Sequence, residues 1–153
     1  MSDSRSSQNP LGLLLRALRL WLGGRIHFRK DIADRHLVDG GEEFVAFRMV
    51  VVTRKDEQSS GQGAIFQVRF RFKNLSPEAN RRLSLIPIPF IVAQPGFRSK
   101  TWLLGQQTRD FIGIYEFDSV DTAEAYWTSL PLRMMRRRAA PGSLRHEVRA
   151  AAD

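Results

Sequence analysis

Strict alternation of apolar and polar residues between Ala64 and Phe72 constrains the fold of this chain more than any other feature. From Phe66 on, phenylalanine or valine occupies every second position, and glutamine or arginine occupies the positions between them. Successive side chains of a β-strand point to opposite faces of a sheet, so the pattern predicts a strand with one buried and one polar face. The buried face comprises Phe66, Val68, Phe70 and Phe72, and the polar face comprises Gln67, Arg69 and Arg71.

Two helices and three further strands are predicted after this strand. Ser76-Pro77-Glu78 and Asp118-Ser119 are typical helix starts, because serine caps free backbone N–H groups and an acid favours the positive end of the helix dipole. The strands are expected at residues 97–104, 111–117 and 144–149. From 64 to 149 the order is therefore strand, helix, strand, strand, helix, strand, which is the ferredoxin-like plan and makes the fold class α+β.

An N-terminal extension lies outside this plan. After a polar tail, Leu11 to Leu22 carries leucines at helical spacing, preceded by Pro10, which suits a first helical turn. Residues 44–53 are apolar on both faces and rich in β-branched and aromatic residues, which indicates a buried strand that pairs either with a sheet edge or with a partner subunit. The chain thus divides into an extension (1–63), a ferredoxin-like domain (64–149) and a short tail (150–153).

The predicted helix at 11–22 has a wide apolar face, so it should contact another surface. Docking on protein, over a sheet edge or the partner subunit, is the favoured interpretation, and weak peripheral contact with a membrane is the alternative. Arg16 and Arg19 interrupt the apolar run and no cleavage pattern follows it, which does not favour a secretory signal. No stretch reaches the roughly 18 apolar residues of a spanning helix. These features predict a cytoplasmic protein.

The chain is basic, since 24 lysines and arginines exceed 16 acidic residues and give a formal net charge of +8. Nucleic-acid binding is nevertheless not favoured, because the aromatic residues fall in the predicted core and not on an exposed platform. Cysteine is absent, and the three histidines have spacings that suit no shared metal face on a helix. Neither a metal nor a cofactor is therefore expected.

Several short motifs of the ferredoxin-like domain are similar to those of one known superfamily. They are Pro95-Gly96-Phe97, Lys100 with Trp102, Gly113-Ile114-Tyr115-Glu116-Phe117, and Ala123 with Ala125-Tyr126. On these residues the chain resembles the dimeric α/β-barrel superfamily, within it the mono-oxygenase branch related to antibiotic-biosynthesis mono-oxygenases. The resemblance implies a homodimer whose two sheets close face to face into a barrel. It also implies a cofactor-independent mono-oxygenase that acts on a small aromatic or polyketide-like compound. The Asn–Trp–His arrangement of the haem-degrading members has no counterpart on the predicted strands, since Asn74 and Asn80 lie outside them.

In such a barrel the polar sheet face lines the lumen and supplies the candidate site. Alternation along the strands assigns these side chains to it: Gln67, Arg69, Arg71, Arg98, Lys100, Trp102, Ile114, Glu116, Arg145, Glu147 and Arg149. The helices should cover Phe97, Leu103, Tyr115 and Phe117. The excess of basic residues in the lumen predicts an anionic ligand, with Trp102 as a flat apolar wall and Tyr126 at the border of the cavity.

Two alternatives to this site stay open. Pairs of arginine and glutamate on neighbouring strands also form structural salt-bridge networks, which suits a non-enzymatic ligand-binding or interaction protein that uses the barrel only to dimerise. The resemblance transfers no catalytic set, so the catalytic residues are unassigned. His146 and Glu116 are the candidates for proton transfer, because these side-chain types can exchange protons when their surroundings tune them.

Overall fold

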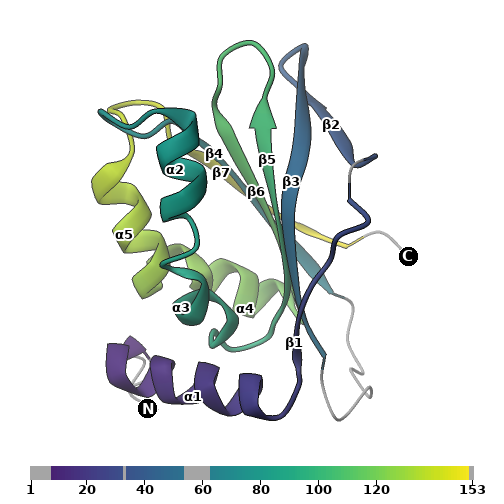
Figure 1. Ribbon diagram of the computed structural model, residues 1–153, viewed down its shortest axis with the longest axis vertical. Coiled ribbons are helices and arrows are strands. Elements are labelled where there is room, and N and C mark those ends of the chain that lie inside the picture. The colour runs from purple at the N-terminus through teal and green to yellow at the C-terminus, as the bar shows by residue number, and fades with distance from the viewer. Residues whose placement is uncertain (1–7, 33, 54–62, 152–153) are drawn as a thin grey trace.

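The computed structural model describes residues 8–32, 34–53 and 63–151 and shows an antiparallel sheet with helices on one face (Figure 1). The strands are β1 (Ile26–Phe28), β2 (His36–Asp39), β3 (Glu42–Val52), β4 (Ala64–Phe70), β5 (Phe97–Gly105), β6 (Phe111–Phe117) and β7 (Arg145–Ala150). The helices are α1 (Pro10–Leu22), α2 (Pro77–Leu83), α3 (Ile88–Val92), α4 (Val120–Ala125) and α5 (Leu130–Arg138), and a 3₁₀ turn (Tyr126–Thr128) joins the last two. The strand order is β1-β3-β5-β6-β4-β7, and β2 pairs with β3.

Strands β5, β6, β4 and β7 confirm the predicted ferredoxin-like plan and the α+β class. β4 lies between β7 and β6, and β6 lies between β4 and β5, with antiparallel pairing throughout. The helix starts are also as predicted. The Ser76 hydroxyl accepts a hydrogen bond from the backbone N–H of Ala79. The Ser119 hydroxyl accepts one in the same way from Thr122.

The N-terminal extension widens the sheet at its β5 edge. β3 pairs antiparallel with β5, so the predicted strand at 44–53 extends a sheet edge of its own chain. β1 and β2 both pair with β3, in a region where the sequence showed no clear period. Gly40 and Gly41 connect β2 to β3 with φ angles of 58° and 79°. A two-residue hairpin turn of this kind needs left-handed backbone at both positions, which glycine adopts without strain.

A bulge in β5 changes which of its side chains face the helices. The register against β6 shifts directly after Phe97, so that Lys100 pairs with Tyr115. One extra residue in a strand reverses the facing of every later side chain relative to simple alternation. Lys100 and Trp102 therefore lie under the helices, and Leu103 lies on the opposite face. The sequence prediction for these three residues is wrong.

Two core clusters fill the two sides of the sheet. The main core lies between the sheet and the helices and confirms the predicted facing of β4 and β6, with Phe66, Phe97, Tyr115 and Phe117 buried there. The second cluster lies on the opposite face and comprises Ile32, Phe44, Ala46, Leu103 and Ile112. Ile32 belongs to the connection between β1 and β2, so the extension itself covers part of that face.

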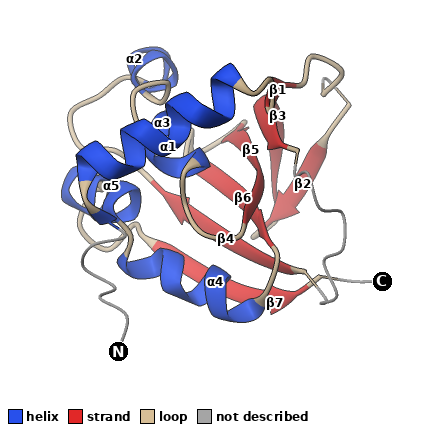
Figure 2. Ribbon diagram, turned by 90° about the horizontal axis from the view of Figure 1, so that it is seen from below, coloured by secondary structure: helices blue, strands red, loops and turns tan. Residues whose placement is uncertain are grey.

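α1 packs on α3, at the outer side of the helical layer (Figure 2). Its buried residues are Leu13 and Ala17. The prediction that this helix docks on protein is confirmed, although the element it contacts is a helix and not a sheet edge. Its remaining large apolar side chains are exposed, namely Leu11, Leu14, Leu15, Leu18, Trp21 and Leu22. None of the helices in the described ranges is long and apolar enough to cross a membrane.

Candidate functional site

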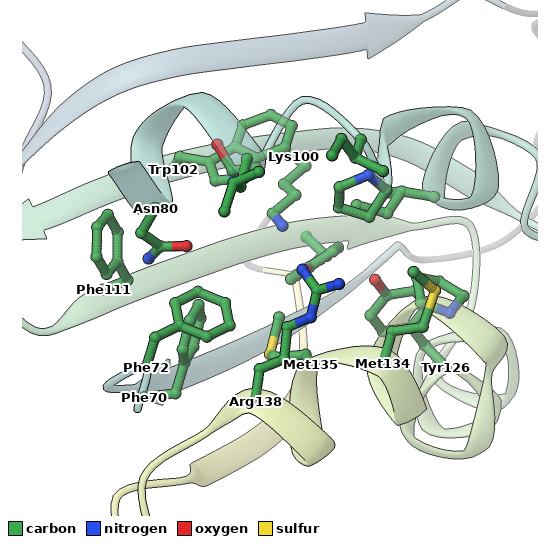
Figure 3. A pocket seen from close by; sticks show the side chains of 17 residues that line it. Phe70, Phe72, Asn80, Lys100, Trp102, Phe111, Tyr126, Met134, Met135 and Arg138 are labelled. Carbon is green, nitrogen blue, oxygen red and sulfur yellow. The ribbon is translucent and has the colours of Figure 1, made fainter. Parts of the chain in front are cut away.

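A pocket of about 60 Å³ lies between the sheet and the helical layer (Figure 3). β4, β5 and β6 form one wall, α5 forms another, and the segment from α2 to α3 closes the third side. Its apolar lining comprises Phe70, Phe72, Leu83, Ile86, Pro87, Ile91, Trp102, Phe111, Pro131, Met134 and Met135. Its polar lining comprises Asn80, Ser84, Lys100, Tyr115, Tyr126 and Arg138. The lining contains both basic and aromatic side chains but no carboxylate.

Lys100 is the most unusual residue of this pocket, since it is only 3% exposed. Its Nζ atom lies 4.3 Å from the ring centroid of Trp102 and 4.5 Å from that of Tyr115. Among the described residues it forms no ion pair with a carboxylate. Burial, reinforced by the positive charge of Arg48, lowers the pKa of Lys100 well below its ordinary value. Burial in this pocket therefore disfavours the protonated form of the amine.

Gly113 makes room for this amine on β6. A Cβ atom at this position would lie 2.9 Å from Cε2 of Tyr115 and 3.3 Å from Cε of Lys100. The first distance is shorter than carbon atoms tolerate without displacement, and the tyrosine ring is held by packing on both sides. The glycine of the Gly113-Ile114-Tyr115 motif thus lets the lysine stem and the tyrosine ring share one stretch of the sheet.

Two tyrosine hydroxyls are buried beside the amine. The rings of Tyr115 and Tyr126 lie 4.6 Å apart between centroids, and neither hydroxyl has a hydrogen-bond partner of regular geometry among the described residues. Burial raises the pKa of both hydroxyls, so they stay protonated. A buried polar group without a partner is uncommon in proteins, and these two can donate to a bound molecule. Tyr126, expected at the border of a cavity, lines this one.

Arg138 and Asn80 complete the polar lining, and neither belonged to the site predicted from the sequence. Figure 3 shows the guanidinium of Arg138 and the amino group of Lys100 pointing into the same space, with the Asn80 amide beside them. Arg138 ends α5 within a run of three arginines, a pattern typical of a helix C-terminus. Asn80 belongs to α2, which packs over the sheet. Only the tertiary arrangement distinguishes these two side chains from ordinary helix residues.

Arg48 links the pocket wall to β3. Its guanidinium donates to the Ser84 hydroxyl at 2.5 Å and to the Arg81 carbonyl at 3.1 Å. It also lies 5.6 Å above the ring of Trp102. One cation on β3 therefore holds both the segment that follows α2 and the aromatic wall of the pocket. This role of Arg48 could not be predicted from the sequence, because a second register shift in the strand pairing lies between Ala46 and Arg48.

The opposite sheet face, predicted to be a ligand-binding lumen, contains a dense group of ion pairs. Arg69, whose side chain is 12% exposed, contacts carboxylate oxygens of Asp39 at 2.8 Å, Glu42 at 3.2 Å and Asp110 at 3.1 Å. Arg71 lies 2.7 Å from the second oxygen of Asp110. Protein carboxylates thus already occupy the donors of Arg69. This arrangement is the structural salt-bridge network that the sequence left open as an alternative to a ligand-binding lumen.

The other predicted site residues do not adjoin Lys100. Ile114 and Glu116 lie on the opposite face, where Glu116 is 3.9 Å from Arg98. His146 lies at the β7 edge and stacks on Trp127, with 3.6 Å between ring centroids. Burial, with a smaller effect of the nearby Arg136, lowers the pKa of His146. Within the described part of the chain, no three His, Asp or Glu side chains are grouped as a metal site would require.

Comparison with known proteins places the fold. No protein-family model matches the sequence, and no curated protein matches it. A haem-degrading enzyme from Listeria monocytogenes aligns in structure with a TM-score of 0.54 at 12% identity, over 72% of this chain and 72% of that chain. An uncharacterised ferredoxin-fold protein related to antibiotic-biosynthesis mono-oxygenases, from Listeria monocytogenes 4b F2365, aligns with a TM-score of 0.52 at 10% identity, over 89% and 88% of the two chains. At these identities the likeness concerns the fold, and at that level the resemblance seen in the short motifs is confirmed.

Proposed function

We propose that the protein binds a small acidic aromatic compound in the pocket around Lys100 and acts on it as a cofactor-independent mono-oxygenase. The observation that carries the proposal is a buried amine between aromatic rings, without a carboxylate partner in the described chain and in the same pocket as the guanidinium of Arg138. The proposed site is this pocket, and it replaces the lumen-facing set that alternation along the strands indicated.

The lining favours one sequence of proton and electron transfers. The neutral amine of Lys100 takes a proton from an activated methylene group next to the aromatic ring, and the new ammonium, together with Arg138, stabilises the carbanion that remains. The carbanion then reduces O₂. One oxygen atom becomes a carbonyl oxygen on the former methylene carbon, and the other leaves as water with the two methylene hydrogens. Dioxygen is the sole oxidant in this balance, and no external reductant is required.

The size of the pocket limits the substrate class. Its volume of about 60 Å³ is well below the roughly 300 Å³ at which ordinary ligand pockets begin. A single aromatic ring is therefore favoured over a multi-ring polyketide. Even a single ring requires some side chains to move, and Met134 and Met135 on α5 are suited to this, because methionine is unbranched and adaptable.

Haem does not fit this pocket. The volume is far too small for a porphyrin, and none of the lining residues is a histidine. Asn80 and Trp102 are present, but His146, the one histidine of residues 64–149, stacks on Trp127 outside the lining. The residues of this pocket therefore do not suit haem chemistry.

A second candidate function is a non-enzymatic binding protein that uses its sheet face to dimerise. The ion pairs of Arg69 favour it, because a face filled by protein carboxylates serves structure and association better than ligand capture. Under this alternative the pocket around Lys100 binds an anion without reacting with O₂.

Binding and turnover can be tested with two probes and one matched pair of variants. Salicylate, a small aromatic anion, should bind in isothermal titration, and Arg138→Met should weaken its binding at least tenfold. Arg137→Met removes an exposed neighbouring arginine outside the lining and should leave the affinity unchanged. In an oxygen electrode, aromatic compounds with an acidic methylene, beginning with 2-oxindole, should support O₂ uptake that Lys100→Met abolishes.

Three results are informative. Salicylate binding, with no O₂ uptake for any of the aromatic compounds that carry an acidic methylene, would favour the binding-protein alternative. Uptake that survives in Lys100→Met would remove the lysine from the mechanism. Equal weakening of salicylate binding by Arg137→Met and Arg138→Met would show that general charge, and not the pocket, attracts the anion.

A further inference from the structure

An exposed apolar surface surrounds α1. We call it the apolar patch, and it comprises Leu11, Leu14, Leu15, Leu18, Trp21 and Leu22 of α1, Phe28 of β1, and Leu85 between α2 and α3. Trp21 is 72% exposed and Leu22 is 79% exposed. A groove of about 520 Å³ runs between α1, β1 and α3 inside this patch. So many exposed large apolar side chains in one place mark an interaction surface.

The spacing of residues on α1 divides the helix into three sectors. At 3.6 residues per turn, the buried Leu13 and Ala17 face α3. The exposed apolar residues, from Trp21 round to Leu15, span about 120° of the circumference next to that sector. Arg16 and Arg19 occupy the remaining sector. An apolar stripe flanked by arginines is the arrangement of a helix that lies in a membrane interface.

Basic residues predominate along α1 and β1, which carry most of the patch. Between residues 8 and 30 the chain contains five basic residues and no acidic residue. They are Arg16, Arg19, Arg25, Arg29 and Lys30. Of these, Arg29 pairs with Asp31 at 3.2 Å, and the other four have no ion pair with a described carboxylate. A second copy of the same patch would bring these cations against like charges, whereas anionic lipid headgroups neutralise them.

We infer that the apolar patch docks on an anionic lipid surface. α1 lies parallel to the surface, its exposed leucines and Trp21 enter the headgroup–acyl boundary, and the basic residues contact the headgroups. The rest of the molecule stands above the membrane as the folded α+β domain. The helix spans nothing, so the attachment is peripheral and reversible. The inference is independent of the proposed chemistry at Lys100.

Vesicle co-sedimentation of the full chain tests this inference. Vesicles of phosphatidylcholine with 30% phosphatidylglycerol should bind the protein, and pure phosphatidylcholine vesicles should bind it far more weakly. Arg16→Gln with Arg19→Gln should reduce partitioning to the anionic vesicles about 30-fold. Leu18→Gln with Trp21→Gln should reduce it at least about tenfold, through lost apolar burial. Raising the salt to 0.5 M should release the wild-type protein, because it screens the charges.

Matched controls separate the patch from general charge and from misfolding. Arg133→Gln with Arg137→Gln removes two exposed cations on α5 and should leave binding unchanged. Val38→Gln removes an exposed apolar residue on β2 and should do the same. All substituted positions are exposed, so circular dichroism should show folded variants. Equal binding to the two kinds of vesicle, or equal loss in the controls, would overturn the inference. A vesicle-free dimer that Leu18→Gln with Trp21→Gln converts to a monomer would also overturn it, because the patch would then be a protein–protein surface.

Discussion

The burial of Lys100 makes the free energy of unfolding depend on pH. Its pKa is lowered in the folded protein by burial, whereas in the unfolded chain it returns to about 10.4. Between these two values the unfolded state binds more protons than the folded state, so the free energy of unfolding contributed by this residue rises with pH. As the pH falls, the folded protein must either hold a charged Lys100 in the pocket or keep Lys100 neutral where the unfolded chain would protonate it. Either state lowers the free energy of unfolding.

Lys100→Met should therefore be more stable than the wild-type protein at pH 7, and its advantage should narrow as the pH rises from 7 toward 10. The change in the difference cannot exceed about 1.4 kcal/mol per pH unit for a single proton. Urea unfolding of both proteins at several pH values measures it. Lys73→Met is the matched control, since Lys73 is exposed and its removal should leave the wild-type pH dependence unaltered. A stability difference for Lys100→Met that does not vary with pH would contradict the assignment.

At the scale of elements, the sequence predicted a strand where its alternation was clean and failed where it was not. From Phe66 on, β4 alternates strictly between apolar and polar residues, and its two faces are as predicted. β5 carries Trp102, Leu103 and Leu104 in succession, so periodicity cannot reveal the bulge that precedes them. The prediction therefore selected Lys100 and Trp102 as site residues but assigned them to the wrong side of the sheet. β1 and β2 were missed because they are short and half exposed, and their pairing with β3 is a long-range effect.

The orientation of α1 can be tested with two leucines, because the rotation of the helix about its own axis decides which leucines are buried. Leu13 is 3% exposed against α3, so Leu13→Ala should cost about 3 kcal/mol through lost burial and a residual cavity. For a chain of this size that corresponds to a Tm lower by about 6–12 °C. Leu15→Ala, at an exposed position two residues away, should change the stability by less than about 0.5 kcal/mol. Equal thermal shifts for the two variants would show that the helix is rotated or detached.

The whole molecule has two candidate association surfaces, and they predict different partners. The apolar patch beside α1 carries excess positive charge, which suits lipid. The sheet face opposite the helices carries arginines already paired with carboxylates, and Ile32 covers it over β3 and β5. The uncovered part of this sheet face lies over β6, β4 and β7. There, Ile65 and Ile114 are half-buried apolar residues among paired polar residues. A partner that packs face to face can reach only this part.

We therefore expect a homodimer centred on Ile114, with a sedimentation mass of about twice 17.5 kDa at 10 µM. Ile114→Glu should produce a monomer, because it would place an unpaired carboxylate in the middle of the buried face. Val38→Glu adds the same charge at an exposed position on β2 and should leave the dimer intact. Trp21→Gln should also leave it intact, since the apolar patch is not the dimer surface in this arrangement.

A wild-type monomer at this concentration, or a dimer that Ile114→Glu does not affect, would show that the sheet face is covered by the N-terminal extension alone. The charge on Arg69 would then serve only to hold that extension, through Asp39 and Glu42, against the sheet.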